Sequence, residues 1–159
     1  MLPRRSSQER QLGGPAPPVA YADLVSPRPP SLPEPSSQQR LVVALDRDGP
    51  WCVWCSREFD DLIRPTREHV VPRVKGGPSI PENEVAACAR CNRERGHASP
   101  VQWLDEVVAR GRRPRPEVLA ASLRRLDEHI AERGGLRRIR RYLTAELRKL
   151  DGRKLDGRG

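Results

Sequence analysis

Two short stretches decide the fold of this chain: Cys52-Val-Trp-Cys55 and Cys88-Ala-Arg-Cys91. Each C-x-x-C step can place two thiolates one tetrahedral edge apart, and two steps complete the four-sulfur coordination of structural zinc. A redox-active C-x-x-C pair is the alternative, but it does not account for a second pair with no cysteine left over. The sequence therefore predicts one zinc site made of Cys52, Cys55, Cys88 and Cys91.

The segment between the two cysteine pairs is longer than a simple zinc ribbon needs. It has 32 residues, whereas about 15–20 are usual. Its pattern predicts two short strands around an irregular Gly- and Pro-rich loop, and the second cysteine pair then opens a helix. The expected ranges are 66–71 and 84–87 for the strands, 75–81 for the loop and 89–95 for the helix. We therefore expect a small α+β domain stapled by zinc.

Composition excludes several classes of protein. The 159 residues carry 30 Lys and Arg against 21 Asp and Glu, and only 36% are hydrophobic, which is too few for a large enzyme with a deep apolar pocket. The longest apolar run, residues 41–45, is far short of a membrane span of about 20 residues. The first ten residues lack the apolar stretch of a secretory signal. We therefore expect a cytoplasmic protein without a membrane partner.

Charge and proline divide the chain into three parts. Residues 1–40 hold 9 of the 17 prolines and are expected to form a disordered leader. Residues 41–100 have 9 basic and 9 acidic residues, and residues 101–159 have 16 and 9. We expect the middle part to be the zinc-stapled core and the last part to be a basic helical extension.

The helical extension has its own pattern. Ser99 and Pro100 open a short helix, and two amphipathic stretches joined by Gly134-Gly135 predict a helical hairpin. Arginines cover the hairpin's polar face, where they either are simply solvated or bind nucleic-acid phosphates. Its leucine stripes could instead support self-association. The large apolar side chains near the cysteines are expected to pack around the zinc: Trp51, Trp54, Phe59, Leu62 and Trp103.

A motif of about ten positions runs through the inserted segment. It consists of Glu68-His69-Val-Val-Pro72, Gly76-Gly77, Asn83, Cys88-x-x-Cys91-Asn92 and Arg95. This order and spacing resembles the HNH nuclease family over residues 50–100, about a third of the chain. The resemblance implies the ββα-metal fold, and says little about the rest of the chain.

The resemblance also implies roles for individual residues. His69 would be the general base, Glu68 and Asn92 would bind one divalent cation, and Asn83 would brace the loop that carries the base. These roles suit the chemistry, because a histidine pKa of about 6.5 leaves the imidazole mostly neutral at pH 7. Carboxylate and amide oxygens are hard ligands that suit Mg²⁺ or Mn²⁺. Basic residues that could contact nucleic acid flank the site: Arg67, Arg73, Lys75, Arg93 and Arg95.

These observations predict a metal-dependent endonuclease that hydrolyses phosphodiester bonds in DNA. The alternative is a zinc-containing module that binds nucleic acid without catalysis, and only Glu68, His69 and Asn92 separate the two. One geometric condition applies, because adjacent residues of a regular strand point to opposite faces. Glu68 and His69 can share a site only where the strand twists or ends. Nothing in the sequence indicates an oligomeric state.

Overall fold

A computed structural model describes residues 34–156 of the chain, which lie within one compact unit that begins at Glu34. The expected leader therefore lies outside the described residues except for its last seven positions. Within the described part, the fold is small and α+β, with a two-stranded antiparallel sheet and five α-helices. This confirms the predicted fold class. None of these helices is long and apolar enough to cross a membrane.

The elements follow the expected order of strand, loop, strand and helix, with one helix before them and three after. They are α1 (Ser37–Asp48), β1 (Pro65–His69), η2 (Arg73–Lys75), η3 (Pro81–Asn83), β2 (Glu84–Cys88), α2 (Ala89–Arg95), α3 (Pro100–Ala109), α4 (Pro116–Arg133) and α5 (Arg137–Asp156). The short 3-10 turns η2 and η3 interrupt the irregular loop between the strands.

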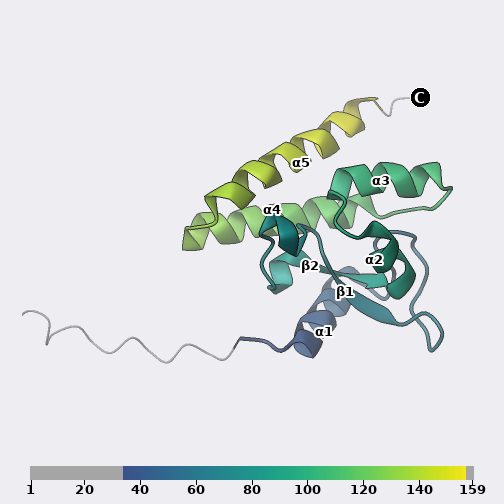
Figure 1. Cartoon of the computed structure of the whole chain (residues 1–159). Coiled ribbons are helices and arrows are strands. Elements are labelled where there is room, and N and C mark those ends of the chain that lie inside the picture. Colours follow the sequence, from purple (N-terminus) through teal and green to yellow (C-terminus); the bar gives the residue numbers. More distant parts are fainter. Residues whose placement is uncertain (1–33, 157–159) are drawn as a thin grey trace, which may run out of the picture. The chain divides into compact units, whose positions relative to one another are not determined.

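The sheet lies between α1 and α2 (Figure 1). Strands β1 and β2 pair from Pro65 opposite Cys88 to His69 opposite Glu84. Since side chains alternate along a strand, Arg67 and His69 share the face toward α1, where Arg67 and Arg40 both contact Glu84. Thr66 and Glu68 share the other face, where they bond to α2. The two faces of one short strand therefore have different chemistry.

Helix α1 is an element that the sequence pattern did not lead us to expect, and residue 40, our boundary for the leader, lies within it. Ser36 caps it, and a reciprocal capping box with Gln39 closes its first turn. Two arginines then attach the helix to β2: Arg40 pairs with the Glu84 carboxylate, and Arg47 donates to the Glu84 carbonyl at 2.8 Å. Polar contacts rather than a broad apolar face thus hold α1 in place.

The C-terminal helices pack onto the zinc-stapled part. Helices α4 and α5 lie side by side, as the Gly-Gly junction predicts (Figure 1). Their apolar stripes are buried in the same core as Trp54: Leu119, Leu123, Leu126, Ile130, Ile139 and Leu143. Ser122 on α4 also donates to the Glu82 carbonyl at 2.9 Å. Most of the surface that the self-association hypothesis requires is therefore already used within the chain.

Two apolar side chains do not pack as expected. Trp54 and Trp103 are fully buried, but Trp51 is 41% exposed and Leu62 is 93% exposed. The Arg115 guanidinium lies over the Trp51 ring, with its central carbon 5.7 Å from the ring centroid. A cation–π contact therefore replaces burial for this ring.

Candidate active site and zinc cluster

The four cysteines converge as predicted. Their sulfur atoms all lie within 4.8 Å of one another, close to the edge of about 3.8 Å that tetrahedral Zn–S bonds of about 2.3 Å imply. Backbone and guanidinium N–H groups donate to the sulfurs: Cys88 to Cys52 at 3.3 Å and Arg112 to Cys91 at 3.4 Å. Such donors stabilise thiolates, which are the zinc-binding form. The cluster therefore fits a closed structural zinc site.

The cluster positions α2 against the sheet. Cys88 is both the last residue of β2 and the N-cap of α2, and Cys91 lies in the first turn of that helix. Cys52 lies close by on the segment that follows α1. Because two separate segments of the chain meet at these sulfurs, an ion there would fix the direction in which α2 presents its side chains to β1.

Asn83 holds the loop between the strands. It is fully buried, and its Oδ1 accepts from the Val71 N–H at 2.8 Å. Its Nδ2 donates to the Val71 and Pro78 carbonyls at 3.1 and 2.9 Å. Gly77 makes this contact sterically feasible, because a Cβ there would lie 1.8 Å from the Val71 carbonyl oxygen.

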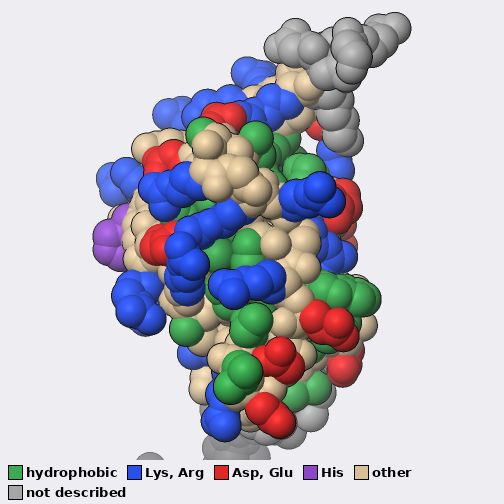
Figure 2. Space-filling model, turned by 90° about the vertical axis from the view of Figure 1, so that its right-hand side faces the viewer, with side chains coloured by type: hydrophobic (Ala, Val, Ile, Leu, Met, Phe, Trp, Pro, Cys, Tyr) green, Lys and Arg blue, Asp and Glu red, His purple; other side chains and the backbone are tan. Residues whose placement is uncertain are grey.

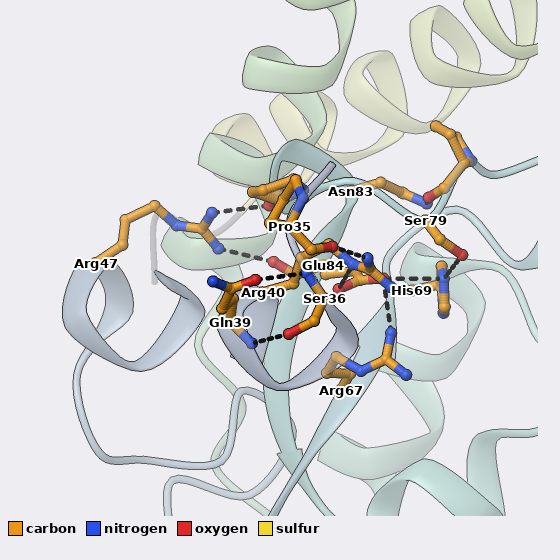
Figure 3. Close-up of polar contacts among 12 residues, drawn as sticks. Pro35, Ser36, Gln39, Arg40, Arg47, Arg67, His69, Ser79, Asn83 and Glu84 are labelled. Atoms are coloured by element: carbon orange, nitrogen blue, oxygen red, sulfur yellow. Dashed lines mark hydrogen bonds and ion pairs between the residues drawn. The ribbon is translucent and has the colours of Figure 1, made fainter. Parts of the chain in front are cut away.

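His69 is the last residue of β1, and its ring is half-buried. The Nε2 atom lies 3.0 Å from the Ser79 hydroxyl and 3.3 Å from Glu84 Oε1 (Figure 3). Among the described residues, Nδ1 makes no hydrogen bond. Burial lowers the pKa of His69, while the nearby Glu84 carboxylate acts in the opposite direction. The imidazole is therefore held at one nitrogen and kept neutral near pH 7.

Glu68 lies on the other face of β1 and is buried. Its Oε1 is paired with the Arg95 guanidinium, which also donates to the His69 and Val70 carbonyls, each at 2.7 Å. Its Oε2 is buried and has no hydrogen-bond partner within the described part of the chain. Burial raises the pKa of Glu68 to about 7, although Arg95 favours the ionised form. One carboxylate oxygen is thus engaged and the other is unsatisfied.

Asn92 lies on α2 and faces the side of β1 that carries Glu68. Its Nδ2 donates to the Arg67 carbonyl at 2.8 Å and to the Thr66 hydroxyl at 3.0 Å. Since the carbonyl can only accept, the amide nitrogen is fixed there and Oδ1 is the atom left over. Oδ1 of Asn92 and the unsatisfied Oε2 of Glu68 are both hard oxygen donors, as Mg²⁺ and Mn²⁺ prefer. The chemistry of this donor pair therefore fits such an ion.

The three side chains are thus divided between two faces. Glu68 and Asn92 lie at the interface of β1 and α2, and the His69 ring lies toward Glu84 and α1. Strand β1 ends at His69, as a shared site requires, but the Glu68 and His69 side chains still lie on opposite faces of the sheet.

The expected nucleic-acid contacts differ in exposure. Arg73, Lys75 and Arg93 are exposed, and Arg67 is half-buried and paired with Glu84 at 3.1 Å. Arg95 differs from our expectation: it is only 3% exposed and its guanidinium is occupied by Glu68 and two carbonyls. It therefore braces the site from inside and does not present its charge to a nucleic acid.

Glu84 is a site residue that the sequence motif does not include. A charged residue inside a strand is ordinarily expected to be solvent-exposed, but Glu84 is fully buried between Arg40, Arg67 and His69. One sequence feature could have indicated this role. Glu84 begins the second strand directly after Asn83, and the residue that pairs with the end of β1 must lie beside His69.

The fold and its site define a zinc-stapled strand–strand–helix domain with an imidazole and hard oxygen donors around the end of one strand. Residues 52–106 match the family model of the HNH endonucleases. The resemblance of this segment to that family is thereby confirmed, and it supports the nuclease class. The chain matches none of the curated proteins and none of the solved structures with which it was compared.

Proposed function

We propose that this protein is a metal-dependent endonuclease that hydrolyses phosphodiester bonds in DNA. The observation that carries the proposal is the imidazole of His69, which is held at Nε2 and makes no hydrogen bond at Nδ1 within residues 34–156. The family match over residues 52–106 supports the reaction class.

His69 acts as the general base in this proposal. A neutral imidazole with an available Nδ1 lone pair can accept the proton of a water molecule as its oxygen attacks phosphorus. Ser79 and Glu84 hold the ring at Nε2, which leaves Nδ1 available. Partial burial helps, because a base that is neutral near pH 7 needs no prior deprotonation.

Glu68 and Asn92 are the residues that would hold a divalent cation, through Oε2 and Oδ1. When bound, such an ion supplies charge compensation for the oxygens of the phosphate. Asn83 keeps the loop after His69 in place through its three hydrogen bonds to Val71 and Pro78, and Arg95 ties the end of β1 to α2.

The substrate path that we propose runs beside η2. This turn begins four residues after His69, and a hollow of about 540 Å³ is lined by Arg73 and Lys75 from η2 and by Arg137 and Arg138 from α5. The same two α5 arginines border a second hollow with Arg140 and Arg141. Such a row of arginines suits the phosphates of a polyanion.

Basic side chains are not restricted to this path. Figure 2 shows Lys and Arg side chains across the middle of one face of the molecule, with hydrophobic side chains between them. A further hollow beside Cys55 and Cys91 is lined by Arg57, Arg90, Arg112 and Arg113. Two of these are already paired with Glu94, and for this reason we favour the η2 path.

Nicking of supercoiled plasmid tests the proposal. The zinc-loaded chain should nick in the presence of Mg²⁺ or Mn²⁺, and His69→Ala should slow nicking by about 10²- to 10⁴-fold, because a general base contributes that much. His97→Ala is the matched control, since His97 is exposed just after α2. Absence of nicking with any divalent cation would favour the non-catalytic nucleic-acid-binding module instead.

A further inference from the structure

Glu84 is a buried carboxylate to which neither the motif nor the family resemblance assigns a role. It is the first residue of β2 and lies directly opposite His69 in the sheet register. Its side chain is fully buried. A buried carboxylate is costly unless it is paired, so its partners indicate why this position tolerates a charge.

Three groups converge on this carboxylate (Figure 3). Arg40 Nε lies 3.0 Å from Oε2, Arg67 NH1 lies 3.1 Å from Oε1, and His69 Nε2 lies 3.3 Å from the same Oε1. Two guanidinium groups donate to this carboxylate. An ionised carboxylate can only accept hydrogen bonds, and this restricts what the imidazole can do.

We propose that Glu84 is a positioning residue that fixes the tautomer of His69, an inference that rests on the proposed function. A neutral imidazole carries one proton. If Nε2 lacked it, the Nε2 lone pair would lie 3.3 Å from a carboxylate oxygen and be repelled by it. With the proton on Nε2, the polar N–H lies beside that oxygen and can donate to the Ser79 hydroxyl. Glu84 therefore places the proton on Nε2 and leaves the Nδ1 lone pair for the attacking water.

Ser79 does not decide the tautomer. Its hydroxyl lies 3.0 Å from Nε2, but a hydroxyl can donate or accept and adapts to either form. Of the two neighbours of Nε2, Ser79 and Glu84, only the Glu84 carboxylate is restricted to accepting hydrogen bonds. The second ring nitrogen of a functional histidine is often set in this way.

A purely structural role for Glu84 makes a different prediction. The residue could serve only to seat α1 through Arg40. Arg40→Met removes that ion pair but leaves Glu84 and His69 in contact, whereas Glu84→Gln keeps the shape and removes the fixed acceptor, because an amide can present either oxygen or nitrogen. The two variants therefore separate positioning from packing.

The test uses the full, zinc-loaded chain, labelled with ¹⁵N-histidine. The chain has three histidines, so long-range ¹H–¹⁵N spectra at a pH where the rings are neutral report each tautomer. We expect His69 in the wild type to be protonated at Nε2. In Glu84→Gln it should become a mixture, and kcat for nicking should fall by about 10- to 100-fold with KM nearly unchanged.

Two controls define the outcome. Arg40→Met should keep both the tautomer and kcat, even if it lowers the melting temperature. Glu82→Gln should also leave the His69 tautomer and kcat unchanged, because the Glu82 carboxylate lies 3.5 Å from Nδ1 of His129 and not beside His69. A wild-type His69 protonated at Nδ1 would overturn the proposal even if Glu84→Gln does not fold. So would an unchanged tautomer and kcat in Glu84→Gln.

The tautomer is measured without substrate, which separates this inference from the proposed function. If Glu84→Gln scrambles the tautomer but the wild type nicks no DNA, then the endonuclease proposal fails and the contact between Glu84 and His69 stands. If the wild type nicks DNA and the tautomer does not depend on Glu84, then only the positioning role fails.

Discussion

At the scale of single residues, the site is organised by two buried carboxylates on opposite faces of the sheet, each paired with arginine. Glu84 with its arginines lies toward α1, and Glu68 with Arg95 lies toward α2. Arg95 also lies over the Trp54 ring, 5.1 Å from its centroid. On one side Nδ1 of His69 makes no hydrogen bond to the described residues, and on the other side Oε2 of Glu68 is buried and unsatisfied.

Arg95 should therefore be far more important for stability than its exposed neighbour Arg93. Arg95→Met leaves the Glu68 carboxylate buried without a partner, so the free energy of unfolding should fall by about 3–5 kcal/mol. Arg93→Met should change it by less than about 0.5 kcal/mol, as exposed substitutions usually do. Urea unfolding of the zinc-loaded chain measures both, and equal effects would contradict the bracing role of Arg95.

The sequence predicted which residues belong to the site better than it predicted their partners. Spacing alone predicted that the four cysteines meet, and the family resemblance indicated His69 and Asn83 as site residues. It did not show that Arg95 is buried or that Glu84 contacts His69, because these contacts join residues 27 and 15 positions apart and depend on which strand face each side chain occupies. Pairing of buried charges is a property of the folded sheet.

At the scale of secondary structure, glycine and proline placed the strands and the C-terminal helices closely, whereas α1 was missed. Its capping box, Ser36 with Gln39, was visible in the sequence, but it directly follows a proline-rich stretch. The helix is also attached through Arg40 and Arg47, and Ala44 is its only buried residue.

The loop between the strands offers a matched pair of glycines. A Cβ at Gly77 would overlap the Val71 carbonyl oxygen, whereas a Cβ at Gly76 would meet an Ile139 side-chain carbon at 3.5 Å, an ordinary packing distance. We expect Gly77→Ala to cost at least about 3 kcal/mol. Gly76→Ala should cost about 1–2 kcal/mol, because Gly76 has a φ of +90°.

Thermal unfolding followed by circular dichroism would rank the two variants. If Gly77→Ala were as stable as Gly76→Ala, the close approach of the loop to Val71, and with it the bracing by Asn83, would be refuted.

At the scale of the whole molecule, the excess of positive charge is the feature that favours a polyanionic substrate. The net charge is +9, and part of it lies on η2 and α5 around two adjoining hollows. Composition alone predicted the excess and its concentration after residue 100. The row itself arises only when α5 folds back beside η2.

The salt dependence of DNA binding tests this row of arginines, measured in a His69→Ala background without added Mg²⁺ or Mn²⁺ so that cleavage does not interfere. For duplex DNA, the slope of log K against log salt should become shallower by about 0.9 for each phosphate that the variant no longer neutralises, hence by about 1.8 for Arg73→Gln with Lys75→Gln. Arg57→Gln with Arg113→Gln removes the same charge from the hollow near the zinc cysteines and should have a smaller effect. Equal effects would indicate that only net charge matters.

Chemical rescue is the most direct test of His69 as the general base. His69→Gly removes the imidazole and leaves a space beside Ser79 and Glu84, so nicking of supercoiled plasmid with Mg²⁺ should fall by about 10²- to 10⁴-fold. Added imidazole should restore it in proportion to its concentration, while the wild type should not respond. A His69→Gly chain that nicks at the wild-type rate without imidazole would contradict the account.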